Sequence, residues 1–243
     1  MKKELFERFI KKYHLNGIIG GVRWITKNGT LQVTTMTSDR KLFADVTLKR
    51  FDGFEDAEIG IMDTKKLLRL LESLPPRNLS FGIVQDSSGC VDALMFSESK
   101  YAMRYATSSL DTIDPRPKMK NIPPWNAAII LDDEFTEWLF GASAAMGDNQ
   151  TLLTVEMSQE TATLEVALGH GDRCSFQPVT VADMDAVKFP LYFQAHHLKE
   201  VLRGNPEFKD PVLNVSDAGL ASIAFSEDDL DSEYYLVKIN VED

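Results

Sequence analysis

Apolar residues recur at helical spacing in four segments of the chain, residues 3–14, 63–74, 132–147 and 194–203. In each segment they gather on one face of a helix and leave the opposite face polar. The acids at 132–134 suit the positive end of the third helix dipole. The apolar positions that we expect to be buried are Leu5, Phe6, Phe9, Ile10, Tyr13, Leu67, Leu70, Leu71, Leu74, Phe135, Trp138, Leu139, Ala142, Met146, Leu198, Val201 and Leu202.

Between the helices the pattern changes to short runs of aliphatic, aromatic and β-branched residues that are broken by turns. Asn28-Gly29, between residues 18–26 and 30–36, is typical of a β-hairpin. Further strands are predicted at 42–48, 78–85, 91–97, 100–107, 127–131, 151–158, 161–169, 174–181, 188–193, 211–216, 220–226 and 234–241. A short amphipathic helix followed by several strands therefore recurs, which predicts four such units paired into two α+β domains.

A proline-rich stretch, residues 108–126, separates the two halves of the chain. Four of the ten prolines lie in it, at positions 115, 117, 123 and 124. Each proline fixes its own φ and lacks an N–H donor, so the stretch is predicted to be an extended, semi-stiff connector. The expected organisation is an N-terminal domain at 1–107, the connector at 108–126 and a C-terminal domain at 127–243.

Composition adds a location and a question about charge. The N-terminal residues contain no apolar run long enough for a signal peptide or a membrane span. Cys90 and Cys174 lie far apart and lack metal-ligand spacing, which fits a reducing cytoplasm. The net charge of −11 argues at first against a nucleic-acid partner, but the positions of the charges decide this question.

Four stretches carry a family resemblance by their joint order. TTMTSDRKLFADVTL (34–48) follows the first helix, KYAMRYAT (100–107) precedes the connector, Ile122-Pro123 lies near its end, and YYLVKINVED (234–243) closes the sequence. In this order they resemble DNA sliding clamps, the family of the proliferating cell nuclear antigen. The placement of the four helices is also similar to that in clamps of T4-like bacteriophages.

The resemblance implies a closed ring of six such domains, and a two-domain chain implies a homotrimer joined head to tail. Helices would line the hole and sheets would form the outer wall. An edge strand such as 100–107 needs a partner, and strand 173–181 of another copy would supply it. The residues expected at this subunit interface are Tyr101, Met103, Tyr105, Cys174 and Phe176.

Basic residues lie opposite the apolar faces of three helices, and these faces would line the ring. They are Lys2, Lys3, Arg8, Lys11, Lys12, Lys65, Lys66, Arg69, Lys199 and Arg203. Contacts from such cations to phosphates give affinity for duplex DNA without reading its sequence. The third helix departs from this pattern, because residues 132–147 hold four acids and no Lys or Arg.

The resemblance also implies a groove beside the connector in which partner proteins insert a short hydrophobic peptide. The matching positions are Met36, Arg40, Ile122, Pro123, Tyr235 and Val237. The expected partners are the replicative DNA polymerase and an ATP-dependent clamp loader. The chain has no GxxxxGK[ST] motif, so the ATP chemistry would belong to the loader. No cofactor and no metal is expected.

Three alternatives keep the question of function open. An enzyme would use His170 with Asp172, or the pair His196-His197, but adjacent helical histidines diverge by about 100° and known catalytic motifs are absent. A monomeric processivity factor would hold DNA on an open basic face. A self-assembling module would have no role with nucleic acid. The acidic loop EDDLDSE (227–233) lacks the ligand spacing of an EF-hand.

Overall fold

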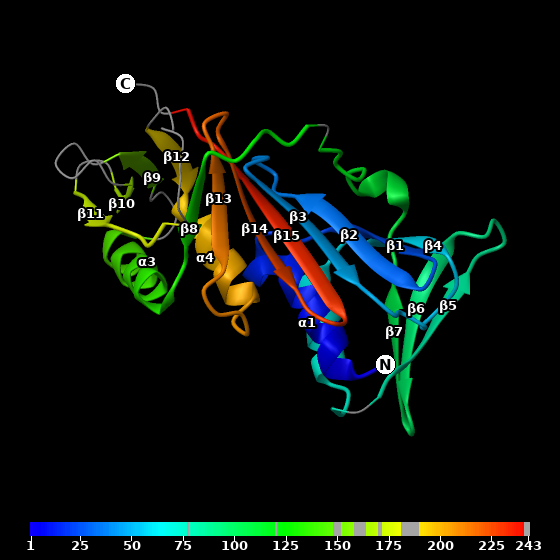
Figure 1. Cartoon of the computed structure of the whole chain (residues 1–243). Helices are drawn as coiled ribbons and strands as arrows, with labels where there is room; N and C mark the ends of the chain where they lie inside the picture. The colour runs from blue at the N-terminus through cyan, green and yellow to red at the C-terminus, as the bar shows by residue number, and fades with distance from the viewer. Residues whose placement is uncertain are drawn as a thin grey trace. The chain divides into compact units, whose positions relative to one another are not determined.

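The structure is a computed structural model that describes residues 1–76, 78–119, 121–147, 152–157, 164–169, 172–180 and 190–240. It consists of helices and antiparallel strands, so the predicted α+β class is confirmed. The chain divides into two compact units. The first holds Met1–Met36, Ala44–Lys118 and Ser226–Ser232, and the second holds Thr37–Phe43, Met119–Phe225 and Glu233–Asp243. Figure 1 shows the course of the chain.

The first unit contains two sheets and two helices. Its strands β4, β1, β2 and β3 are neighbours in that order, and β5, β6 and β7 form a second sheet. Its elements are α1 (Lys3–His14), η1 (Leu15–Gly17), β1 (Val22–Lys27), β2 (Thr30–Met36), β3 (Leu42–Leu48), β4 (Ala57–Ile61), α2 (Thr64–Glu72), β5 (Ser80–Gln85), β6 (Val91–Glu98), β7 (Tyr101–Ala106) and η2 (Leu110–Thr112).

The second unit repeats this composition. Its strands β15, β14, β13 and β8 are neighbours in that order, and a second sheet has the order β11, β10, β9 and β12. The elements are β8 (Ala127–Ile130), α3 (Asp133–Met146), β9 (Leu152–Met157), β10 (Leu164–Leu168), β11 (Cys174–Phe176), β12 (Leu191–Gln194), α4 (Ala195–Gly204), β13 (Val212–Ser216), β14 (Leu220–Ser226) and β15 (Leu230–Val237). Strands β3 and β15 each contribute residues to both units.

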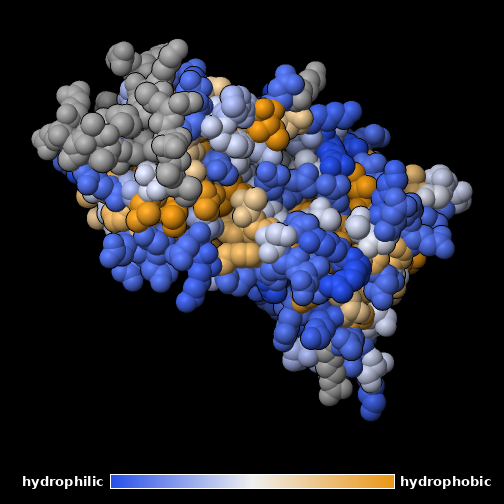
Figure 2. All heavy atoms as spheres, in the orientation of Figure 1, coloured by the Kyte–Doolittle hydropathy of each residue, from blue (hydrophilic) through white to orange (hydrophobic). Residues whose placement is uncertain are grey.

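The core forms where the helical and strand periodicities meet. On α1, the rings of Phe6 and Phe9 are fully buried, and Phe6 meets Trp24 of β1 edge to face at a centroid distance of 5.5 Å. Strand β1 buries every second residue, as its pattern predicts. In the second unit Phe135 and Leu139 of α3 are fully buried in the same way. Hydrophilic residues cover most of the face that Figure 2 shows.

The helix limits follow from local chemistry. Asp63 caps α2 by accepting a hydrogen bond from the Lys66 amide at 2.8 Å, and Asp132 caps α3 by accepting one from the Phe135 amide at 2.8 Å. The first helix ends at His14, and Leu15 and Asn16 adopt left-handed backbone conformations there. None of the helices in the described part of the chain is long and apolar enough to cross a membrane.

Several strand limits differ from those expected. Residues 18–21 are not a strand, and β4 was not predicted. The segment 227–233 is not a loop throughout, because β15 begins at Leu230. The expected strand at 174–181 ends at Phe176. Parts of the predicted strands lie outside the described residues, at 151, 158, 161–163, 181, 188–189 and 241.

Candidate nucleic-acid interface and partner pocket

An exposed group of cations lies on the two helices of the first unit. Helices α1 and α2 contact each other, and their apolar faces are buried, so several of their basic residues remain exposed on the opposite side. The exposed members, which we call the basic helix face, are Lys2, Lys11, Lys65, Lys66 and Arg69. Exposed lysine and arginine side chains can meet phosphates without sequence preference.

Three of the ten basic residues expected on helix surfaces are buried instead. Lys3, Lys12 and Lys199 are 6%, 1% and 1% exposed. The ammonium of Lys3 donates to the carbonyl oxygen of Leu74 at 2.5 Å and lies 3.4 Å from the Glu7 carboxylate. Their expected placement on an outer helix face is therefore wrong, because helical spacing alone does not reveal what packs over a polar position.

Arg8 has a partner of its own. Its guanidinium donates to the carboxylate of Glu227, in the turn that precedes β15. Two further ion pairs tie the same acidic segment to the first unit, Lys49 with Asp231 at 2.7 Å and Arg50 with Asp229. These bonds occupy three of the five carboxylates of the segment. No group of three or more metal-ligating side chains occurs among the described residues.

The helices of the second unit present a different charge. Asp133, Glu134 and Glu137 of α3 are exposed, and the helix carries no basic residue. On α4, Lys199 lies over the ring of Phe140 at 5.7 Å, and Arg203 lies 4.9 Å from the same ring. Arg203 also donates to Glu200 at 2.5 Å. Of the expected cations on α4, only Arg203 is exposed.

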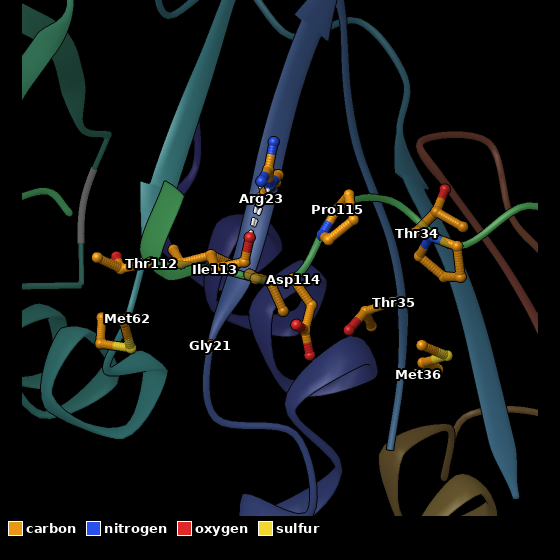
Figure 3. A pocket seen from close by; sticks show the side chains of 12 residues that line it. Gly21, Arg23, Thr34, Thr35, Met36, Met62, Thr112, Ile113, Asp114 and Pro115 are labelled. Atoms are coloured by element: carbon orange, nitrogen blue, oxygen red, sulfur yellow. Dashed lines mark hydrogen bonds between the residues drawn. The ribbon is translucent and has the colours of Figure 1, made fainter. Parts of the chain in front are cut away.

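The connector begins as a fixed segment of the first unit. Arg23 of β1 donates to the carbonyl oxygens of Leu110 and Ile113, each at 2.7 Å from Nη2. Beside it lies a cavity of about 240 Å³ (Figure 3), lined by Gly21, Val22, Arg23, Thr34, Thr35, Met36, Met62, Thr112, Ile113, Asp114, Pro115 and Pro117. Met36 is the one residue of the expected peptide groove in this lining.

The other five residues of the expected groove belong to the second unit. Ile122 is 52% exposed, Pro123 is half-buried, and Tyr235 is 7% exposed. Arg40 is exposed and has a left-handed φ of 59°. The turn that carries Arg40 meets the end of β15, because the Val237 amide donates to the Lys41 carbonyl oxygen at 2.9 Å. Arg40 and Val237 thus lie on two directly bonded segments.

The residues expected at the subunit interface differ in exposure. Tyr101 is 55% exposed, whereas Met103 and Tyr105 are 7% and 4% exposed. The Tyr105 hydroxyl donates to the Asp63 carbonyl oxygen at 3.1 Å, and burial raises its pKa. Cys174 and Phe176 are half-buried, and the Phe176 ring stacks on Trp138 of α3 at 5.3 Å.

Among the described residues, the histidines considered for an enzyme do not form a catalytic group. His196 and His197 are adjacent on α4 with ring centroids 6.3 Å apart, and His197 is 4% exposed. Burial lowers the pKa of His197. Asp172 is exposed, and His170 lies outside the described residues.

The fold is that of the DNA sliding clamps. The PCNA2–PCNA3 complex from Sulfolobus tokodaii, in which PCNA denotes proliferating cell nuclear antigen, matches with a TM-score of 0.69 at 7% identity. That match covers 98% of this chain and 97% of that chain. A. fulgidus PCNA, solved with the C-terminal region of FEN-1, matches with a TM-score of 0.73 at 14% identity. It covers 100% of this chain and 98% of that chain.

PCNA from Entamoeba histolytica matches with a TM-score of 0.73 at 13% identity, over 99% of this chain and 97% of that chain. At these identities the likeness concerns the fold. No family model and no curated protein matches the sequence. The resemblance that the sequence suggested is therefore confirmed at the level of the fold.

Proposed function

We propose that this chain is a DNA sliding clamp, a processivity factor that encircles duplex DNA as a homotrimer and catalyses no reaction itself. The observation that carries the proposal is the likeness to PCNA over the whole length of the chain. Head-to-tail contacts close into a ring only when each contact applies a fixed rotation. This rotation depends on the shape of the whole chain, so retention of the complete clamp fold supports assembly into a closed ring. The domains proposed are an N-terminal clamp domain at 1–107, a connector at 108–126 and a C-terminal clamp domain at 127–243.

The basic helix face is the surface that we assign to DNA. Its five cations are exposed, whereas Lys3, Lys12 and Lys199 are buried and Arg8 is paired with Glu227. Phosphate contacts from Lys and Arg hold a duplex at any sequence, which a protein that travels along DNA requires. The acids of α3 repel phosphate, so we assign no contact to that helix.

The partners proposed are a DNA polymerase and an ATP-dependent clamp loader, with binding at Met36, Arg40, Ile122, Pro123, Tyr235 and Val237. The A. fulgidus relative was solved with the C-terminal region of another protein bound to it, which supports capture of a peptide segment. Exposed Ile122 offers an apolar contact for such a segment. The proposed location is the cytoplasm, or that of the host cell if the protein is viral.

Two measurements test the proposal. Sedimentation at tens of micromolar should give a trimer, and a monomer that still stimulates polymerase would favour the open-face processivity factor instead. The protein should remain on nicked circular DNA and leave it when the circle is cut, because a closed ring slides off a free end. Equal retention on both forms would refute encirclement.

A charge-reversal series tests the DNA surface. The variant Lys11→Glu with Lys66→Glu and Arg69→Glu should lose retention on the circle, and its salt dependence should weaken by roughly 0.9 in log–log slope for each lost phosphate contact. The matched control, Lys27→Glu with Lys100→Glu and Lys209→Glu, makes the same charge change at exposed sites outside the helices. Equal loss in both variants would assign the effect to net charge, not to the helices.

A further inference from the structure

The turn between β2 and β3 is built around the side chain of Asp39. One carboxylate oxygen, Oδ1, accepts hydrogen bonds from the Thr37 hydroxyl and from the Lys41 amide, the latter at 3.0 Å. The Arg40 amide donates to the Thr37 carbonyl oxygen at 2.9 Å, which closes the turn. Asp39 therefore fixes the conformation in which Arg40 is presented. Burial acts to raise the pKa of Asp39, but these hydrogen bonds and the contacts with His197 and Gln194 together hold it below its usual value.

The second carboxylate oxygen of Asp39 faces the first turn of α4. Oδ2 lies 3.8 Å from Nε2 of His197, and the Gln194 side chain hydrogen-bonds the same carboxylate. Gln194 is the N-cap of α4, and His197 follows in its first turn. An anion at this position is favoured by the positive end of the helix dipole. All of these residues belong to the second unit.

His197 meets Asp39 from a buried position. Its side chain is 5% exposed, whereas that of Asp39 is 38% exposed. Nδ1 of His197 is buried and has no hydrogen-bond partner among the described residues. The neutral ring with its proton on Nε2 suits this arrangement, because Nε2–H then points to the carboxylate and Nδ1 carries no proton. A second proton on Nδ1 would be buried without an acceptor.

We propose that His197 is a pH-sensitive positioning residue. The neutral ring keeps the Asp39 carboxylate in contact with the first turn of α4, and a proton on Nδ1 releases the turn that carries Arg40 from this contact. The proposal rests on the proposed function only for its consequence, because Arg40 and Val237 are assigned to the partner groove. Release would disturb that groove, since the Lys41 carbonyl oxygen accepts the hydrogen bond from the Val237 amide.

The direction of the pH effect follows from the surroundings of His197. Burial lowers its pKa, and the attraction of Asp39 opposes this more weakly. His196, its neighbour on α4, also lowers the pKa of His197. Glu200, one turn further along α4, is bonded to Arg203. In the turn, Arg40 and Lys41 follow Asp39. In the released state His197 reaches water, and its side chain then has a pKa near 6.5. The contact between Asp39 and the first turn of α4 is therefore strongest above pH 6.5 and weakens as the pH falls below it.

Amide hydrogen exchange on the intact protein tests the proposal. We expect protection factors of the Lys41 and Val237 amides to fall between pH 7.5 and pH 5.5, by up to about tenfold per pH unit for one proton. The variant His197→Gln keeps an N–H donor and cannot titrate, so its protection should be independent of pH. The control His196→Gln changes the neighbouring ring and should retain the pH dependence of the parent.

A second measurement reads the contact itself. In Asp39→Asn the carboxylate that lies 3.8 Å from Nε2 of His197 is replaced by a neutral amide, so an NMR titration should find that the pKa of His197 differs from that of the parent. An unchanged pKa, or equal pH dependence in the parent and in His197→Gln, would overturn the proposal. Neither experiment involves DNA or a partner protein, so failure of the clamp assignment would leave these outcomes unaffected.

Discussion

The guanidinium of Arg23 donates from both Nε and Nη2 to the carbonyl oxygen of Ile113, at 3.2 and 2.7 Å. Arg23 also pairs with Glu58 of β4 at 3.2 Å. A bidentate contact from a planar group restrains direction as well as distance. The beginning of the proline-rich connector is thereby held against β1, and proline stiffness alone does not position it.

Loss of this contact should expose the connector to proteolysis. In Arg23→Met the aliphatic stem is retained and the donors are removed, so the carbonyls of Leu110 and Ile113 lose their partner. We expect tryptic cleavage after Lys118 to accelerate several-fold, because local opening controls such cleavage. Arg104→Met, which removes an exposed ion pair with Asp92, is the control and should cleave at the parental rate. Equal rates in all three proteins would exclude this role of Arg23.

The sequence was sufficient for the helices because each has a strong apolar stripe. Phe6, Phe9, Leu67, Phe135 and Leu198 are all fully buried, as their spacing predicts, whereas the other expected core positions Leu5, Leu70, Trp138, Ala142 and Met146 are only half-buried. The same reasoning fails for Lys3, Lys12 and Lys199, since a helical wheel treats every polar position as exposed. Burial of a lysine depends on neighbours from other elements, such as the Leu74 carbonyl oxygen that receives Lys3.

The strand errors have equally local causes. Strand β4 has little periodicity of its own, and it forms by pairing with β1. At Gly60 the backbone meets Ser108 so closely that a Cβ would overlap the Ser108 carbonyl oxygen, and this approach is not visible in the sequence. Residues 227–233 resemble a loop by their acids, but Lys49 and Arg50 neutralise Asp231 and Asp229.

The hydrogen bond between α1 and β1 should contribute measurably to stability. Trp24 Nε1 donates to the Tyr13 hydroxyl at 3.1 Å, the hydroxyl also bonds Thr64, and burial raises the pKa of Tyr13. Tyr13→Phe leaves a buried indole N–H without its acceptor, so the free energy of unfolding should fall by about 1–3 kcal/mol. Urea denaturation measures this. Tyr101→Phe, at an exposed tyrosine, should change it by less than about 0.5 kcal/mol.

Stability should decrease on mild acidification. His14 is 6% exposed, its Nδ1 lies 2.6 Å from the Ile19 carbonyl oxygen, and burial lowers its pKa. In the unfolded chain the His14 side chain has a pKa near 6.5, so below that pH the unfolded state binds more protons than the folded state. The free energy of unfolding therefore falls as the pH decreases from 7.5 to 5.5. His14→Gln should show a smaller decrease in urea titrations at the two pH values. A decrease as large as that of the parent would exclude His14 as its source.

The edge of β7 offers the sharpest test of ring assembly. Within the described strands β7 has one neighbour, β6, and the Thr107 amide donates to the Asp92 carbonyl oxygen at 3.0 Å. Hydrogen-bonded pairs alternate along an antiparallel ladder, so the odd-numbered residues of β7 bond to β6. The amide of Ala102 then points away from β6 and is available to a strand of another copy.

Ala102→Pro removes this outward N–H and leaves the bonds to β6 in place. We expect sedimentation to show a shift from trimer to monomer, with an unchanged circular dichroism spectrum. Ala102→Thr retains the N–H and should remain a trimer, which separates the backbone effect from that of a larger side chain. Met103 and Tyr105 are buried within their own unit and Tyr101 is exposed, so this part of β7 can offer its backbone and the Tyr101 side chain to another copy. A stable Ala102→Pro trimer would therefore place the subunit contact at a different edge.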